Sequence, residues 1–228
     1  MPKLRKKQAW MSDATRQPAV VAHITRKITA KQNSILKELD EESIAVYLFL
    51  RSQFSQGNVG QNPLFQFVYR SYYRLDNAGL SPDFKTRYFE LMERARGSGV
   101  IDLPAMATEL HRYKTLRKHK SLQFSFVTKL AATVNPDYPI YDRAVGRALG
   151  FPPPAGGRNF DQGLDRSMKF YGWLRNLYST LLDDPTILNV IQNLTARYPR
   201  ATGVPQIKAL DFIFWSAGKL GIVLVPSK

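Results

Sequence analysis

The residues best suited to chemistry lie in one segment of the chain, residues 120–149. Near its start, the small hydroxyl residues Ser125 and Thr128 lead into an expected helix, whose first backbone N–H groups would be unpaired and suited to a phosphate. Further along, Pro139 is expected to stiffen the start of a second helix. Asp142 would lie in its first turn, where the helix dipole favours a carboxylate, with an ordinary helix cap as the alternative. The segment therefore combines anion-binding groups with one fixed negative charge.

A dense run of positive charge precedes this segment, in residues 112–120. We expect it to supply the countercharge for phosphate groups, although a solvated charged face is the alternative. The side chains expected to contact such phosphate groups are Arg117, Lys118, Lys120, Ser125, Thr128, Arg143 and Arg147.

The whole chain is strongly basic. Its 228 residues contain 33 Lys and Arg against 18 Asp and Glu, which gives a formal net charge of +15. Such a field indicates a polyanionic partner, most simply nucleic acid, because each contact between a cation and a phosphate releases condensed counterions. A charge that only keeps the protein soluble is the weaker alternative.

The composition excludes several kinds of site. The chain has no cysteine, so disulfides, zinc–thiolate sites and iron–sulfur clusters are excluded. Its three histidines, His23, His111 and His119, make a histidine metal site improbable, and we expect neither a metal nor a cofactor. We find no apolar run long enough to span a bilayer and no signal-peptide pattern, and therefore expect a cytoplasmic protein without a membrane partner.

Helical periodicity dominates the chain, and the alternation typical of strands is almost absent. We expect an all-α bundle of about eight to ten helices. Helix starts are indicated at Asn62-Pro63, at Ser81-Pro82 and at Asp102, each a capping residue with a proline close behind.

The expected boundaries follow the same signals. Residues 1–28 are predicted to form an extended or frayed basic arm, and residues 29–228 a helical domain. The helix that starts at Asp102 is expected to continue into the basic run. Further helices are expected over residues 122–134, 139–149, 160–182, 185–198 and 205–220.

The stretch from Pro139 to Arg147 resembles a motif of the helix–hairpin–helix DNA glycosylases, in particular their 8-oxoguanine DNA glycosylase-like branch. The family motif has the form Pro-Val-Asp-x-His-Val-x-Arg, and the match covers the Pro, the apolar residue, the Asp, the Val and a following Arg. The resemblance spans about residues 117–150. The chain departs from the family in lacking a glycine-rich hairpin, where residues 123–126 stand instead. It also has a shorter interval between Lys129 and Asp142.

The resemblance implies two helical lobes that flank a DNA-binding cleft, and a monomeric enzyme that needs no cofactor. Such an enzyme flips a damaged or modified base out of double-stranded DNA and cleaves its N-glycosidic bond. Asp142 would stabilise the positive charge that develops on the deoxyribose. Lys129, or Lys120 if the turn is reshaped, would attack the sugar and add lyase activity. Without such a lysine, Asp142 would activate a water.

Aromatic side chains would stack on the flipped base or fill the gap that it leaves. The candidates are Phe124, Phe126, Tyr141, Phe214 and Trp215, with core packing as the alternative.

The sequence does not decide whether the excised base is an oxidised guanine or a bulky modified base of bacteriophage DNA. It therefore also leaves open whether the enzyme serves DNA repair or anti-phage defence. A non-catalytic DNA-binding helical protein is the main alternative, and a helical scaffold for an acidic partner is a second. A metal-dependent nuclease is disfavoured, because acids and histidines do not cluster at ligand spacing.

Overall fold

The computed structural model describes residues 17–151 and 159–226. These residues form ten α-helices and no β-strand, which confirms the predicted all-α class. They divide into two compact units that we describe separately. Unit 1 comprises residues 1–40, 142–153 and 169–228, and unit 2 comprises residues 41–141 and 154–168. The long helix α9 (Phe160–Leu182) contributes its first nine residues to unit 2 and the remainder to unit 1.

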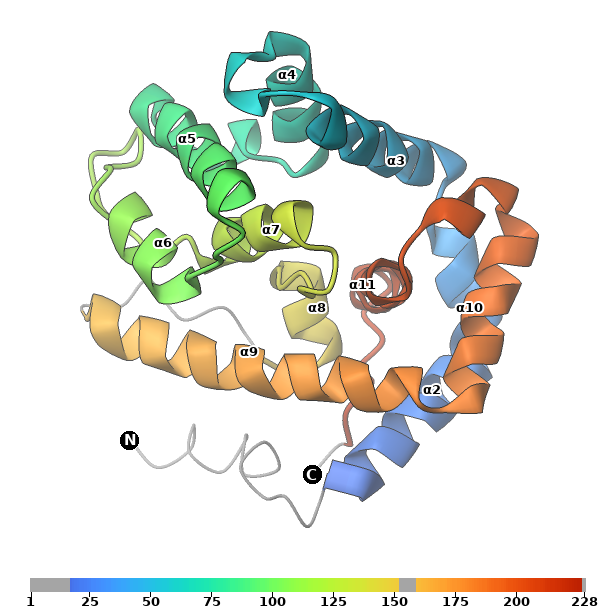
Figure 1. The fold of residues 1–228 in the computed structure, drawn as a ribbon. Coiled ribbons are helices and arrows are strands. Elements are labelled where there is room, and N and C mark those ends of the chain that lie inside the picture. The colour runs from blue at the N-terminus through green and yellow to red at the C-terminus, as the bar shows by residue number, and fades with distance from the viewer. Residues whose placement is uncertain (1–16, 152–158, 227–228) are drawn as a thin grey trace. The chain divides into compact units, whose positions relative to one another are not determined.

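Unit 1 is built around its last helix, α11 (Gln206–Lys219). This helix packs against α2 (Gln17–Glu38), α8 (Arg143–Ala148) and α10 (Pro185–Arg197), and Figure 1 shows it nearly end-on with α8 and α10 on either side. A short 3-10 helix, η5 (Pro199–Gly203), connects α10 to it. Apolar side chains point in every direction from α11, as is typical of a helix enclosed in a core.

The contact between α8 and α11 is especially close. A Cβ atom added at Gly218 would lie 1.9 Å from the carbonyl oxygen of Ala144. The Arg147 guanidinium also donates a hydrogen bond of 3.0 Å to the Gly218 carbonyl. The absence of a side chain at residue 218 therefore allows the backbones of α8 and α11 to touch.

Unit 2 contains the helices between residues 41 and 134: α3 (Glu41–Gln56), η3 (Val59–Gln61), α4 (Pro63–Tyr72), η4 (Asp76–Ala78), α5 (Pro82–Ser98), α6 (Leu103–Leu110) and α7 (Phe124–Val134). The predicted starts of α4, α5 and α6 are confirmed. The side chains of Asn62, Ser81 and Asp102 accept hydrogen bonds from the backbone N–H groups of Phe65, Phe84 and Ala105.

The centre of unit 2 is aromatic and hydrogen-bonded. Tyr69 and Tyr88 are fully buried, and their hydroxyl oxygens lie 2.9 Å apart. The Tyr88 hydroxyl donates to the backbone carbonyl of Phe126, 2.9 Å away, and so joins α5 to α7. Because both hydroxyls have partners, these large rings are buried without leaving a polar atom unsatisfied.

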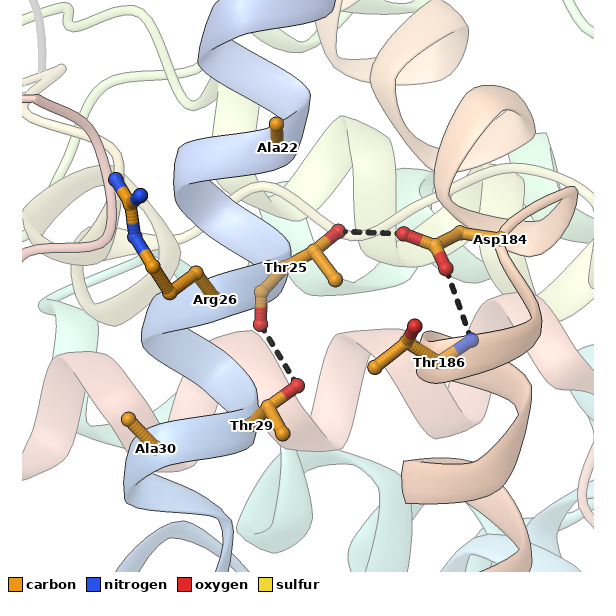
Figure 2. A pocket seen from close by; sticks show the side chains of 7 residues that line it. All are labelled: Ala22, Thr25, Arg26, Thr29, Ala30, Asp184 and Thr186. Atoms are coloured by element: carbon orange, nitrogen blue, oxygen red, sulfur yellow. Dashed lines mark hydrogen bonds between the residues drawn. The ribbon is translucent and has the colours of Figure 1, made fainter.

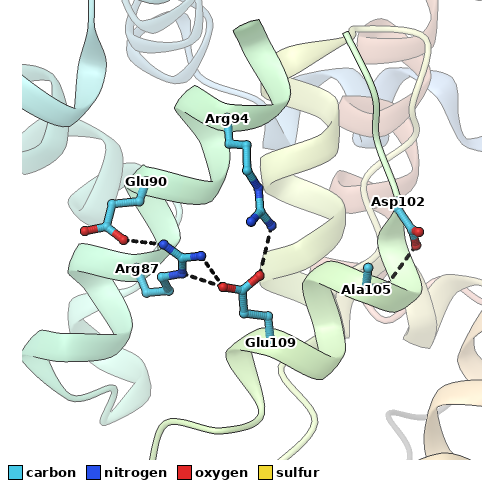
Figure 3. Close-up of polar contacts among 6 residues, drawn as sticks. All are labelled: Arg87, Glu90, Arg94, Asp102, Ala105 and Glu109. Carbon is cyan, nitrogen blue, oxygen red and sulfur yellow. Dashed lines mark hydrogen bonds and ion pairs between the residues drawn. The ribbon is translucent and has the colours of Figure 1, made fainter. Parts of the chain in front are cut away.

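An ion-pair network joins α5 to α6 on the outside of unit 2 (Figure 3). Arg87 donates to both Glu90 and Glu109, and Arg94 donates to Glu109 at 2.9 Å. Burial opposes ionisation of Glu109, but the hydrogen bonds and charges of the two arginines outweigh it and lower the pKa of its carboxyl.

Three predicted boundaries are wrong. Residues 17–28 belong to α2, with Ile24 and Ile28 fully buried, so an extended arm can cover at most residues 1–16, which lie outside the described residues. The helix from Asp102 ends at Leu110 and does not continue into the basic run. The helix expected over residues 139–149 is α8, which begins only at Arg143.

No helix in the described part of the chain is long and apolar enough to cross a membrane.

Candidate functional site

Asp142 is the N-cap residue of α8, one position before the helix, which confirms the helix-cap alternative and not the predicted position in the first turn. Its Oδ1 atom accepts hydrogen bonds from the backbone N–H groups of Ala144, at 2.8 Å, and Val145, at 3.0 Å. Its Oδ2 atom accepts no hydrogen bond from the residues that the structure describes. One oxygen of this half-buried carboxylate therefore holds the helix start, and the other is left for a different partner.

A cluster of buried polar side chains lies within the same unit. Lys208 and Asp211 of α11 are 7% and 3% exposed, and Tyr178 of α9 is fully buried. The Tyr178 hydroxyl donates to Oδ1 of Asp211 at 3.2 Å. The Lys208 ammonium lies 4.6 Å from the centre of the Phe212 ring, close enough for a cation–π contact.

Asp142 is close enough to this cluster to influence its ionisation. Burial lowers the pKa of the Lys208 amine, and the negative charges of Asp211 and Asp142 oppose that change. Burial also raises the pKa of the Tyr178 hydroxyl, and the charges of Asp211 and Asp142 raise it further. We call Asp142, Tyr178, Lys208 and Asp211 the charged cluster.

Burying such a cluster removes charged groups from water and costs free energy of folding. A cluster that is kept despite this cost is a candidate for a functional site. The sequence analysis missed Lys208 and Asp211. The available signal was a pair of opposite charges three residues apart in a helix that is otherwise almost entirely apolar.

The two predicted nucleophiles lie in unit 2, whereas Asp142 belongs to unit 1. Lys129 of α7 is 9% exposed, its ammonium donates to the Tyr73 carbonyl at 3.3 Å, and it lies 5.0 Å from the centre of the Phe126 ring. Lys120 is exposed in the loop before α7. Neither lysine belongs to the charged cluster, so within unit 1 the lysine that accompanies Asp142 is Lys208.

The basic run forms a loop between α6 and α7. Arg117, Lys118 and Lys120 are exposed there, as contact with phosphate requires. Lys118 has a φ of +61°, in the left-handed region that residues with a Cβ rarely adopt. The loop is closed by a hydrogen bond of 2.8 Å from the Thr115 N–H to the His119 carbonyl.

The remaining phosphate candidates differ in their surroundings. Thr128 is fully buried, and its hydroxyl accepts from the Tyr141 N–H at 3.1 Å, so it joins α7 to the segment before α8 and cannot contact DNA. Ser125 is half-buried, with its carbonyl 3.0 Å from the Thr128 hydroxyl. Arg143 and Arg147 are exposed on α8, although Arg147 already binds the Gly218 carbonyl.

Most of the aromatic candidates are packing groups. Phe124, Phe126, Tyr141 and Phe214 are at most 6% exposed, which agrees with the core-packing alternative, and their role in a base pocket stays a prediction. The rings of Phe214 and Tyr178 stack at 5.1 Å, while those of Phe124 and Tyr141 lie 6.1 Å apart. Trp215 alone among the five is half-buried, and the Lys219 ammonium lies over its ring at 4.8 Å.

A shallow pocket of about 450 Å³ lies in unit 1 between α2 and the start of α10 (Figure 2). At its edge the Asp184 carboxylate accepts hydrogen bonds from the Thr25 hydroxyl and the Thr186 N–H, both at 2.8 Å. This aspartate is therefore satisfied by the protein, and the pocket contains none of the predicted site residues.

No group of three or more acidic or histidine side chains suited to a metal ion occurs in the described ranges. Comparisons of the chain with protein-family models, with curated proteins and with solved structures found no match.

Proposed function

We propose that this protein is a DNA glycosylase of the helix–hairpin–helix type, which flips a modified base out of double-stranded DNA and cleaves its N-glycosidic bond. The observation that carries the proposal is the state of Asp142. Its Oδ1 atom is fixed by the start of α8, while its Oδ2 atom accepts no hydrogen bond from a described residue. A carboxylate held in this way is suited to face a developing cation without reorganising during the reaction.

The chemistry follows from the charge that the reaction creates. As the bond between the sugar and the base breaks, the departing base takes the electron pair and the deoxyribose becomes positively charged at C1′. A fixed negative charge lowers the energy of that transition state more than that of the neutral substrate, which is the condition for catalysis. Water then adds to C1′ and loses a proton, and Asp142 is the group that we assign to accept it.

The charged cluster supports this role from inside unit 1. Lys208 interacts electrostatically with the carboxylates of Asp211 and Asp142, and its ammonium form stabilises their negative charge. We assign Lys208 as a positioning residue and not as the nucleophile. Because the Lys129 ammonium is held by the Tyr73 carbonyl and the Phe126 ring, we further propose hydrolysis by water without lyase activity.

The net charge of +15 and the exposed basic loop support DNA as the partner. The substrate base that we propose is an oxidised guanine or a bulky modified base such as those of bacteriophage DNA, which correspond to a role in repair or in defence.

The test compares Asp142→Asn with Asp102→Asn on duplexes that carry a panel of modified bases. Asparagine caps a helix about as well as aspartate, so both variants keep a helix cap and only the first loses the proposed catalytic charge. We expect Asp142→Asn to bind DNA at least as tightly as the unmodified protein and to release base at least about 100-fold more slowly. Asp102→Asn should be unaffected. Base release is measured as abasic sites cleaved by hot alkali.

Two outcomes contradict the proposal. Base release by Asp142→Asn within twofold of the original rate would remove the carboxylate from the mechanism. Tight DNA binding with no base released from any duplex would favour the non-catalytic DNA-binding alternative.

Borohydride reduction during turnover tests the lysines separately: we expect no trapped adduct, and an adduct that disappears in Lys129→Met would restore the lyase role of that residue.

A further inference from the structure

The loop between α6 and α7 exposes a large apolar side chain at its tip. Leu116 is 64% exposed, although leucine gains free energy from burial. A single exposed leucine is common on protein surfaces, so exposure alone indicates nothing. The rigidity of the loop and the charges around Leu116 distinguish it.

The backbone on both sides of Leu116 is fixed by hydrogen bonds. The Leu116 N–H donates to the Gly79 carbonyl at 2.8 Å, and Thr115 forms a β-bridge with the buried Leu80. Within the loop, the Lys118 N–H donates to the Thr115 carbonyl at 2.8 Å, and the Thr115 hydroxyl donates to the His119 carbonyl at 3.1 Å. These hydrogen bonds fix the backbone of the loop and connect it to the segment before α5, while the side chain of Leu116 remains exposed to solvent.

Positive charge surrounds this apolar tip. The exposed residues Lys114, Arg117, Lys118 and Lys120 all lie within four positions of Leu116. Leu64 is a useful contrast, because it is also an exposed leucine of unit 2, at 60%, but has no cation within three positions. Leu116, unlike Leu64, is therefore exposed next to groups that bind a polyanion.

A rigid apolar tip between cations is complementary to a nucleic-acid duplex, in which apolar spaces between stacked bases alternate with phosphates along each strand. We propose that Leu116 inserts into the base stack of DNA while the neighbouring cations bind the phosphates on either side. The proposal takes only its DNA partner from the proposed function and is independent of the role of Asp142. It places the insertion at Leu116 and not at the buried aromatic rings considered from the sequence.

The test uses the full chain with Leu116→Ala and, as a matched control, Leu64→Ala. The probe is a duplex with one abasic site flanked by 2-aminopurine, whose fluorescence rises when it loses its stacking partner. We expect the unmodified protein and Leu64→Ala to bind with equal affinity and to raise the fluorescence. Leu116→Ala should bind about tenfold more weakly and leave the fluorescence unchanged at saturation. Because Leu116 is mostly exposed, its variant should melt at the same temperature as the original.

Each other outcome overturns the insertion. If Leu116→Ala matches the control in affinity and fluorescence, the proposal for Leu116 fails while DNA binding stands. If the unmodified protein shows no salt-dependent binding to any duplex, this inference and the proposed function fail together. If it instead binds vesicles of anionic phospholipid, and Leu116→Ala abolishes that binding, the loop is a membrane anchor.

Discussion

At the scale of single residues, the structure separates charges that stabilise unit 2 from charges that we assign to function. Glu109 belongs to the first group, because its carboxylate binds two arginines and joins two helices. The carboxylate of Asp142 belongs to the second, because one of its oxygens receives no hydrogen bond from a described residue. The sequence alone presents both as acids near cations and does not distinguish them.

The lowered pKa of Glu109 has a consequence for stability. In the folded state its carboxyl ionises below its ordinary value of 4.5, so its contribution is fully present above that pH and is lost as the pH falls through the lowered folded value. We expect Glu109→Gln to cost about 1 kcal/mol at pH 7, or a few degrees of melting temperature, because Arg94 is more than half exposed. The difference from the original should shrink as the pH falls below 4.5 and through the lowered folded value.

Thermal melts between pH 3 and pH 7 measure this effect. Glu90→Gln is the control. Glu90 also pairs with Arg87, but it lies on the same helix as Arg87 and is 52% exposed. If the melting temperature of Glu109→Gln is lowered equally at every pH, the loss of stability comes from altered packing and not from the lost charge of the carboxylate.

Residue types also set a limit on prediction from sequence. The capping roles of Asn62, Ser81 and Asp102 were predictable, because a cap depends on residues two or three positions away. For the charged cluster the sequence offered only the pair of opposite charges in α11, because the burial of Lys208 and Asp211 results from helices distant in the chain. The same holds for the aromatic candidates: ring type is typical of base stacking and of core packing alike, and only tertiary structure shows which rings are buried.

At the scale of elements, the critical contact is that of α8 with α11, since α8 carries Asp142 at its start and α11 carries Lys208. Gly218 permits this contact.

The end of α6 illustrates what the local sequence pattern could not show. Helix α6 ends at Leu110, and in the following loop the N–H of Leu116 donates a hydrogen bond to the carbonyl of Gly79, 37 positions away in the chain.

We expect Gly218→Ala to destabilise unit 1 by about 2 kcal/mol or more, because the new methyl group would overlap the Ala144 carbonyl and force α8 away from α11. If Asp142 acts as proposed, base release should fall as well. The matched control is Gly172→Ala on α9, where nothing lies within 4 Å of the added atom. That change should raise stability by up to about 1 kcal/mol, because alanine favours helix.

Circular dichroism melts of the two variants measure the difference. Equal and small shifts for Gly218→Ala and Gly172→Ala would mean that α8 and α11 are not in close backbone contact in solution.

At the scale of the whole molecule, the net charge of +15 should produce DNA binding that weakens steeply with salt. The structure offers an unusually well matched pair of variants for locating the contacts. Lys118 and Arg74 are both exposed cations of unit 2 with left-handed backbone, at φ +61° and +60°. Glycine at either position removes one charge and relieves the same backbone strain.

We therefore expect Lys118→Gly and Arg74→Gly to change the melting temperature alike but DNA binding differently. Lys118→Gly should reduce the slope of log affinity against log salt concentration by about 0.9, the value for one lost phosphate contact. Arg74→Gly should leave the slope unchanged. Identical slopes for the two variants would indicate that the basic loop does not contact DNA.

The division of the chain has a consequence for the order in which the protein is made. Residues 41–141 of unit 2 interrupt unit 1, and the helices α10 and α11, which pack against α2, lie near the other end of the chain. At a synthesis rate of about 5–20 residues per second, the ribosome needs roughly ten seconds or more to deliver those partners after α2 has emerged. Helix α2 is therefore synthesised well before the helices that pack against it, and during that interval its uncovered apolar side chains are a target for a chaperone.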